Sequence, residues 1–222
     1  NMLRLEGGSF GTLRGAGAIA RTFGDWDVYA GIDALTADGF RQNSAQDQAR
    51  GTLNIGRSFG EDREVRLIVY GADIEQQVPG TLTLAEALAT PWKASAAALA
   101  NKWARDQTVG RLTLQTRWRF DDHLSFEGGV YATSTDLHHP IPIVIDQQIE
   151  TQGAFGRFDW SGELGGHRAD LFFGLSYRQG TNDQMLFVNM GGQSGFKIGD
   201  AHQEASGLDV FAEGRWFASD NL

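Results

Sequence analysis

The chain has 222 residues, a formal net charge of −9 and 41% hydrophobic residues, a balance typical of an ordered domain. Its acidity argues against a nucleic-acid partner, because phosphate binding requires a basic face, and the absence of cysteine excludes a disulfide scaffold or a thiolate metal site. The longest apolar runs, such as Leu67–Tyr70 and Ile141–Ile145, are far shorter than the ~20 residues that a membrane-spanning helix needs. A helical membrane protein is therefore excluded.

About ten segments in which polar and apolar residues alternate predict β-strands. In the clearest one, Arg111–Phe120, arginines fall on odd-numbered positions, while Leu112, Leu114 and Trp118 fall on even-numbered ones, so the two faces differ in polarity. A tilted strand crosses the apolar part of a membrane with ~9–11 residues, which most of these segments provide. The expected strands are Met2–Gly8, Leu13–Phe23, Trp26–Asp38, Arg50–Phe59, Val65–Gln76, Arg111–Phe120, Leu124–Thr135, Thr151–Trp160, Ala169–Gly180 and Gly207–Phe217.

The connections between these segments alternate between short and long. The short ones are rich in Gly or Asp, as hairpin turns are, and occupy residues 23–26, 59–63, 121–123 and 161–167. The long ones are expected to be loops over residues 39–49, 78–108, 137–150 and 181–206. Outer-membrane barrels have short periplasmic turns and long external loops. The sequence therefore predicts an all-β fold, an antiparallel transmembrane β-barrel wall of about ten strands.

Tryptophan placement orients this wall. Four tryptophans lie beside the short turns, where a membrane barrel has a periplasmic girdle of aromatic rings; they are Trp26, Trp118, Trp160 and Trp216. The turns at Gly24, Asp62, Asp122 and Gly165 are then expected on the periplasmic side. The alternative is a soluble core with aromatic side chains at its hairpin ends.

The 78–108 loop holds the strongest candidate ligand contacts. Thr83–Leu88 and Ala94–Trp103 are rich in strong helix formers and predict two short helices there. Aromatic and cationic side chains in the same loop suit an anionic ligand, and these are Trp92, Lys93, Trp103 and Arg105. The alternative is that the loop only folds over the barrel mouth.

His138 and His139 are further candidate ligand contacts in an expected external loop. Neutral imidazoles suit iron, zinc or copper. Adjacent residues on a strand point to opposite faces, so the pair is a poor site for a single metal ion, and no metal site is expected. Ordinary loop packing before Pro140 is the alternative.

Charged residues at strand positions are expected to face the lumen, where they line water, pair across neighbouring strands or dock a plug domain. They are Asp33, Asp73, Glu127, Asp159, Asp209 and Glu213, with Arg14, Arg57, Arg117, Arg157, Arg178 and Arg215. The sequence has no nucleophile elbow, no His-Glu-x-x-His motif and no phosphate-cradling loop. Neither an enzyme nor a cofactor is therefore expected.

Five stretches of the chain have a familiar order and spacing: Gly7–Arg14, Asp38–Ser44, Gln77–Thr83, His138–Ile141 with Val144–Gln147, and Phe187–Gly192. They resemble segments of TonB-dependent outer-membrane receptors of the siderophore and iron-complex type. The resemblance runs from Asn1 to about Phe217.

The resemblance implies a 22-stranded barrel in the outer membrane of a Gram-negative bacterium, closed by an N-terminal plug domain. Such a receptor takes up a ferric siderophore or another iron complex with energy supplied by the TonB complex through the plug. Residues 1–222 are expected to be part of the barrel domain, an early piece of its wall, because neither the plug nor the remaining strands are recognised in the sequence. Asn1 onward lacks the pattern of a signal peptide, so the chain is expected to be internal or processed.

Three alternatives accompany this interpretation. The first is a complete small outer-membrane barrel that acts as a passive pore or anchor. The second is a small outer-membrane barrel with lipase activity, and the third is a soluble β-sandwich with carbohydrate-binding loops. The sequence does not identify the imported ligand.

Overall fold

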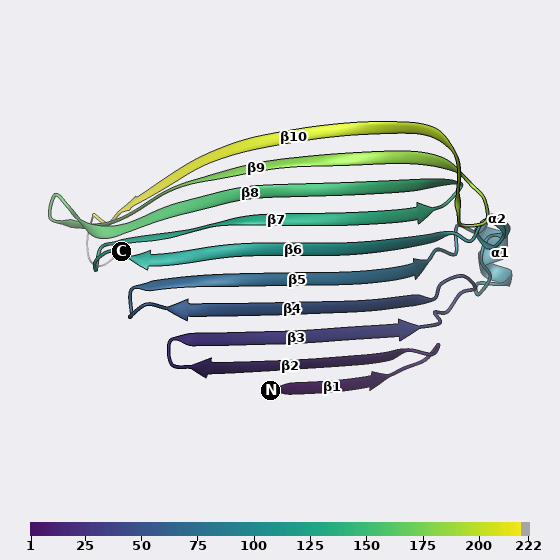
Figure 1. Cartoon of the computed structure of the whole chain (residues 1–222), viewed down its shortest axis with the longest axis horizontal. Coiled ribbons are helices and arrows are strands. Elements are labelled where there is room, and N and C mark those ends of the chain that lie inside the picture. The colour runs from purple at the N-terminus through teal and green to yellow at the C-terminus, as the bar shows by residue number, and fades with distance from the viewer. Residues whose placement is uncertain (219–222) are drawn as a thin grey trace.

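A computed structural model describes residues 1–218 as one antiparallel sheet of ten strands and two short helices (Figure 1). The strands are β1 Met2–Gly7, β2 Leu13–Phe23, β3 Trp26–Ala37, β4 Gln46–Ser58, β5 Arg63–Gln77, β6 Ala104–Arg119, β7 Leu124–Pro140, β8 Ile143–Leu164, β9 His167–Asn189 and β10 Ser194–Trp216. The helices α1 Leu84–Ala89 and α2 Ala96–Ala100 lie between β5 and β6, as expected. Within residues 1–218 no helix is long and apolar enough to cross a membrane.

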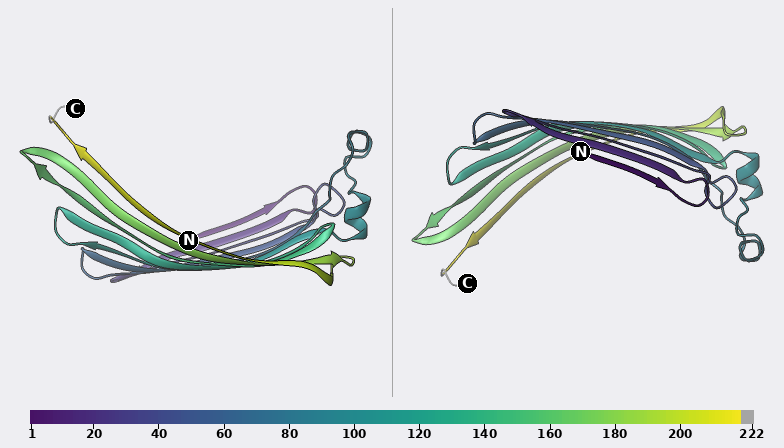
Figure 2. Two further views of the ribbon diagram at one scale, coloured as in Figure 1. Left: turned by 90° about the horizontal axis from the view of Figure 1, so that it is seen from above. Right: turned by 90° about the horizontal axis from the view of Figure 1, so that it is seen from below.

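The sheet is a single open layer. Each strand pairs with the next one along the chain, and among residues 1–218 the edge strands β1 and β10 do not pair with each other. Figure 2 shows that the layer is curved, with the helices beyond one end of the strands. A closed small barrel would join its first and last strands, and a sandwich would need a second packed sheet. The described residues match neither alternative, and the prediction of an antiparallel barrel wall is confirmed.

Two of the predicted long loops are wrong. Residues 137–150 lie largely in β7 and β8, which meet at a tight turn at residues 141–142. Residues 181–206 lie largely in β9 and β10, which meet at residues 190–193. The strands continue because their backbone pairing does not depend on which side chains they carry. Within these segments, at residues 146–148 and 182–184, both faces are polar. The alternation that marks a half-buried strand is lost there, although the strand continues.

The register across the strands separates an apolar face from a polar face. Leu53, Val69 and Leu112 lie in one row across β4, β5 and β6. The preceding and following residues, such as Tyr70 and Arg111, lie in register on the opposite face. In a closed membrane barrel such alternation places apolar side chains against lipid and polar ones against the lumen. The fold thus has a distinct surface for each environment.

The apolar face has no cover within the described chain. Leu112 and Leu114 are 50% and 47% exposed. The largest fully buried side chains among residues 1–218 are Val144 and Pro140, so the sheet encloses no core. Large contiguous apolar surfaces mark sites of contact with lipid or protein. The apolar face therefore requires an apolar environment outside the described chain.

Toward the end of the sheet near the helices, many positions of the apolar face are occupied by carboxylates instead of apolar side chains. Together they are termed the acidic collar: Asp47, Asp73, Glu75, Asp106, Asp136, Asp146, Glu150, Asp183, Asp200 and Glu204. The prediction that Asp73 faces the lumen is wrong. Its side chain shares a face with Val69 and accepts a hydrogen bond from Thr108 Oγ1 at 2.9 Å. Along strands β4–β10, the side chains on this face thus change from apolar to acidic toward the helices.

Candidate functional site

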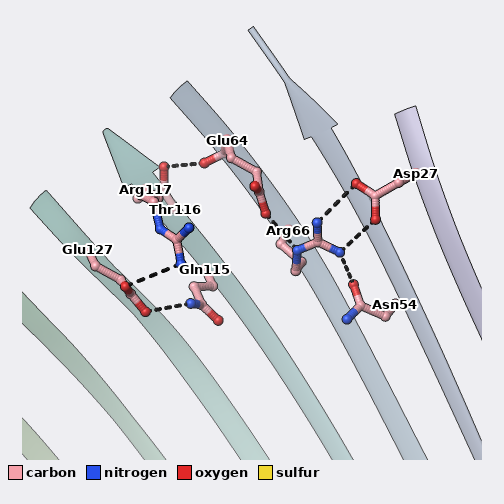
Figure 3. A network of polar contacts seen from close by, with 8 residues as sticks. All are labelled: Asp27, Asn54, Glu64, Arg66, Gln115, Thr116, Arg117 and Glu127. Atoms are coloured by element: carbon pink, nitrogen blue, oxygen red, sulfur yellow. Dashed lines mark hydrogen bonds and ion pairs between the residues drawn. The ribbon is translucent and has the colours of Figure 1, made fainter. Parts of the chain in front are cut away.

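An ion-paired cluster centred on Arg66 occupies the polar face near the short turns (Figure 3). The Arg66 guanidinium donates to both carboxylate oxygens of Asp27 at 2.9 Å. It also donates to Asn54 Oδ1 at 2.6 Å and to Glu64 Oε1 at 2.7 Å. Gly56 stands in register between Asp27 and Arg66, and a Cβ atom there would collide with both side chains. The glycine therefore leaves the space through which Arg66 on β5 reaches Asp27 on β3.

A second cluster extends the polar network to β7 (Figure 3). Arg117 Nη2 lies 3.7 Å from Glu127 Oε2, and Gln115 Nε2 donates to Glu127 Oε1 at 2.8 Å. On the apolar face, the Thr116 hydroxyl donates to the backbone oxygen of Glu64 at 2.8 Å and links β6 to β5. The side chains of the two clusters form a polar wall from β3 to β7 in which arginine and carboxylate groups alternate.

Further arginine–carboxylate pairs extend this wall toward the short turns. They are Arg119 with Asp62, Arg157 with Asp159 and Arg215 with Glu213. The polar face from the Gln115 row to the short turns is termed the lower wall. Apart from Asp73 and Arg57, the charged residues predicted to face the lumen lie on the polar face. Arg57 lies instead on the apolar face, in register with Trp26.

The four tryptophans of the predicted girdle all lie on the apolar face near the short turns: Trp26, Trp118, Trp160 and Trp216. Arginines accompany two of them. The Cζ atom of Arg57 lies 5.0 Å from the ring centroid of Trp26, and that of Arg63 lies 5.6 Å from the ring centroid of Trp118. Aromatic rings with adjacent cations suit a lipid headgroup region. The girdle role of these rings stays a prediction.

Residues 38–45 and 78–103 pack together beyond one end of the sheet and are termed the outer cap. Arg41 links the two segments, because its Nε donates to the backbone oxygen of Lys93 at 2.9 Å and its Nη1 to that of Gly80 at 3.0 Å. Hydrogen bonds from a charged donor are stronger than neutral ones. The Arg41 guanidinium is therefore one of the groups that hold the two segments of the outer cap together.

Two asparagines hold the outer cap in place: Asn43 joins its two segments, and Asn189 joins it to the neighbouring hairpins. Asn43 Nδ2 donates to the backbone oxygen of Trp103 at 2.9 Å. Asn189 Nδ2 donates to the backbone oxygens of Asn101 at 3.0 Å and of Ile141 at 2.7 Å. The sequence analysis assigned these residues no role, because their partners are backbone atoms far along the chain. The only signal is that Asn43 and Asn189 both fall in segments that carry the family resemblance.

Helix α1 is held by its N-terminal cap rather than by packing. Thr83 and Glu86 form a capping box, in which each side chain bonds the backbone N–H of the other residue. These hydrogen bonds from the Thr83 hydroxyl and backbone lower the pKa of the Glu86 carboxyl. Leu84 and Leu88 are both 77% exposed. The helix thus presents two uncovered leucines at the outer surface of the cap.

The predicted ligand residues of the 78–108 loop are divided between the outer cap and the sheet. Trp92 is 51% exposed beside Lys93, between the two helices. The ring of Trp103 contacts Gly80, and its Nε1 atom is buried without a partner among residues 1–218. Arg105 lies on β6, on the polar face. Their role in ligand binding stays a prediction.

His138 and His139 lie in β7 rather than in a loop, and they point to opposite faces of the strand, as adjacent residues must. His138 Nδ1 lies 2.5 Å from Asp146 Oδ1, and its Nε2 lies 3.1 Å from the backbone oxygen of Gly192. His139 Nδ1 lies 2.7 Å from the backbone oxygen of Ala104. The two imidazole rings therefore do not face a common site, and a role in ligand binding for either ring stays a prediction.

Arg41→Ala is expected to loosen the outer cap without unfolding the sheet, because three backbone oxygens, those of Lys93, Gly80 and Pro79, lose a charged donor. Such bonds contribute about 1.5–3 kcal/mol, so cleavage within residues 78–103 should accelerate by about tenfold or more, measured by limited proteolysis of intact cells. Arg105→Ala is the matched control, since Arg105 makes one hydrogen bond, a long one of 3.5 Å to Gln107. Equal cleavage rates in both variants would contradict the assignment.

Comparison with known proteins identifies the architecture. No protein-family model matches the sequence. The chain superposes on FpvA of P. aeruginosa, solved with bound pyoverdine and iron, with a TM-score of 0.84 and 9% identity over 98% of this chain and 35% of that one. The ferric citrate transporter FecA gives 0.76 and 13% over 93% and 33%. Fiu, a ferric-catecholate import receptor of E. coli K12, gives 0.76 and 10% over 96% and 41%.

The chain therefore spans between a third and two fifths of the length of these structures. At such low identity the shared feature is the fold. Ten strands in one curved antiparallel sheet, with a two-faced alternation, superpose on part of each of these longer proteins. The chain has the fold of the barrel wall of TonB-dependent siderophore and iron-complex receptors.

Proposed function

We propose that the chain is part of an outer-membrane receptor that takes up a scarce nutrient, a ferric siderophore or another iron complex, by TonB-energised transport. The observation that carries the proposal is the open two-faced sheet, which combines an uncovered apolar face with an ion-paired polar face. The similar structures are described as transporters and import receptors of iron complexes. A receptor of this kind carries out transport rather than catalysis.

The open edges support a larger barrel. In lipid, unpaired backbone groups of an edge strand are too costly, so membrane-spanning sheets close on themselves. Within residues 1–218, β1 and β10 have a partner on one side only. We propose that further strands of the whole protein complete the wall to the 22 expected from the family resemblance. A passive pore made of these ten strands alone is not favoured, because that barrel would close through β1 and β10.

The lower wall is proposed to dock a plug domain. Its arginines are each paired with a carboxylate, so it presents many hydrogen-bonding groups and no uncompensated positive charge. Such a surface holds a polar domain without binding it irreversibly, since exposed ion pairs contribute little individually. In this proposal the TonB complex acts on the plug, and the ten strands remain a rigid frame against outer-membrane lipid.

Uptake in cells tests the proposal. In a strain that lacks the full-length protein containing this chain, uptake of radioactive iron should be lost for at least one member of a panel of ferric chelates. Uptake should return on complementation, and it should again be absent when the TonB gene is deleted. Diffusion of a small uncharged sugar across the outer membrane is the control and should not change. Unaltered uptake of every chelate, with slower sugar diffusion, would support the passive pore instead.

A further inference from the structure

Over strands β4–β10, the polar face beyond the lower wall carries positive charge without negative charge. The polar-face positions of β4–β10 on the helix side of the Gln115 row are termed the upper wall. The described strands place no aspartate or glutamate there. The upper-wall arginines are Arg50, Arg105, Arg111 and Arg178. The amides around them are Gln46, Gln48, Asn54, Gln76, Gln107, Gln147, Asn182, Gln184 and Gln203.

Arg111 and Arg178 have the most open surroundings. Arg111 Nε donates to the Thr133 hydroxyl at 3.2 Å, a neutral partner that leaves the charge uncompensated. Arg178 stands in register between Gly153 on β8 and Gly207 on β10, so neither neighbouring strand offers a side chain beside it. Both guanidinium groups retain donors for a partner outside the chain.

The other two arginines also bond neutral groups. Arg50 Nη2 donates to Gln48 Oε1 at 2.7 Å, and Arg105 bonds Gln107 at 3.5 Å. Asp33 of β3 is the cross-strand neighbour of Arg50. That carboxylate, however, accepts a hydrogen bond from Arg14 Nε at 2.7 Å, so it neutralises a different arginine.

The contrast with the lower wall shows that this distribution is local. In the lower wall Arg66, Arg117 and Arg157 each lie beside a carboxylate. The chain as a whole has a net charge of −9, and the acidic collar lies on the opposite face at the same height as the upper wall. A cationic surface lined by amides and hydroxyls attracts anions and offers them many hydrogen bonds.

From this placement we infer that the upper wall is an anion-selective approach to the ligand site, so the imported ligand is a net-negative complex rich in carboxylate, phenolate or carbonyl oxygens. The inference rests on the proposed function for its ligand, but the charge preference of the surface is a property of the ten strands themselves. Arg111 and Arg178 are the residues that set it.

The preference of the upper wall for anions can be measured from the reaction rates of single cysteines, even though the ligand is not identified. The chain contains no cysteine, so a new one within it is readily distinguished. Thr151→Cys lies on the polar face, in register with Thr133 and Gly180, between the strands of Arg111 and Arg178. Gln148→Cys lies on the acidic collar between Asp136 and Asp183. Each is placed in the full-length protein on intact cells.

Three methanethiosulfonate reagents are compared: the anionic ethylsulfonate, the cationic ethyltrimethylammonium and the neutral methyl compound. Thr151→Cys should react faster with the anion than with the cation, each relative to the neutral reagent, by about fivefold at low salt. Gln148→Cys should show the reverse order. Adding Arg111→Gln and Arg178→Gln together should abolish the anion preference at Thr151→Cys. Arg117→Gln in the lower wall should leave it unchanged.

The neutral reagent also reports whether each variant is assembled and open to solutes. Equal rates with the two charged reagents at Thr151→Cys, a cation preference there, or no reaction with any reagent would each overturn the inference. The uptake experiment on the full-length protein fails or succeeds separately. Chelate uptake without the charge preference would refute only this inference. The charge preference without chelate uptake would refute only the proposed receptor function.

Discussion

Leu114→Arg is expected to destabilise the protein in a membrane and to reduce its assembly, whereas Thr113→Arg one position earlier is expected to be tolerated. Leu114 lies on the apolar face in register with Leu67 and Val130, and Thr113 lies on the polar face. An arginine on the lipid side of a barrel costs about 2–4 kcal/mol near the middle of the bilayer, while lumen positions accept charge. The two variants carry the same added charge and differ only in the face that receives it.

The measurement is unfolding by urea in lipid vesicles, together with the amount of each variant that reaches the outer membrane. Leu114→Arg should lower the free energy of unfolding by the amount given above and reduce the assembled fraction. Thr113→Arg should stay within about 1 kcal/mol of the parent, as surface changes do. Equal losses in the two variants would show that the apolar face does not contact lipid.

Arg66→Gln is expected to destabilise the lower wall more than any other single arginine replacement there. It would leave Asp27 and Glu64 without the cation that both contact. The Arg66 side chain is 23% exposed, so the loss falls between that of a buried pair and a surface pair, about 1–3 kcal/mol. Arg119→Gln removes a pair that is half exposed and should cost clearly less stability than Arg66→Gln, because exposed ion pairs contribute little.

Denaturant unfolding of a double-mutant cycle isolates this contribution. Asp27→Asn should recover part of the stability lost in Arg66→Gln, because it removes one of the two uncompensated carboxylates. Gly56→Ala should mimic the loss, since its Cβ occupies the space that the two side chains share. Independent, additive effects of Arg66→Gln and Asp27→Asn would show that the contact contributes nothing to stability.

The alternation of polar and apolar residues along the sequence identified the strands wherever one face of the sheet is apolar. Arg111–Phe120 was clear because leucines and arginines separate by face, and the structure extends that strand to Ala104. The halves of β8 and β9 near the 141–142 and 190–193 turns were missed. There Asp146, Gln147 and Gln148 are consecutive and all polar, since neither face meets hydrocarbon. The sequence therefore predicts the extent of the apolar belt rather than the full length of the strands.

The two misassigned charges could have been placed correctly from the sequence. Asp73 has the same parity as Leu67 and Val69 in its strand, and Arg57 has the same parity as Ile55. Odd-numbered and even-numbered positions point to opposite faces, and this alternation places both residues on the apolar face. They were expected to face the lumen because they are charged. The structure shows that charge is accepted on that face once the strand extends beyond the apolar belt.

The outer cap could not have been derived in the same way. Arg41 donates hydrogen bonds to the backbone oxygens of Gly80 and Lys93. Contacts between a side chain and backbone groups so far along the chain cannot be predicted from a pattern of residue types. The two short helices were predictable because alanine-rich composition is local. The division of Trp103 and Arg105 between cap and sheet was not predictable, because it depends on where the loop ends.

A spin-label scan along β6 tests the central claim most directly, that this sheet separates lipid from a polar lumen. Single cysteines from Leu112 to Trp118 in the full-length protein in lipid vesicles would be labelled and their collision rates with oxygen and with a neutral nickel chelate compared. The account predicts a period of two, with oxygen contact highest at Leu112, Leu114 and Thr116 and nickel contact highest at the positions between them. A scan without alternation, or high nickel contact at every position, would contradict it.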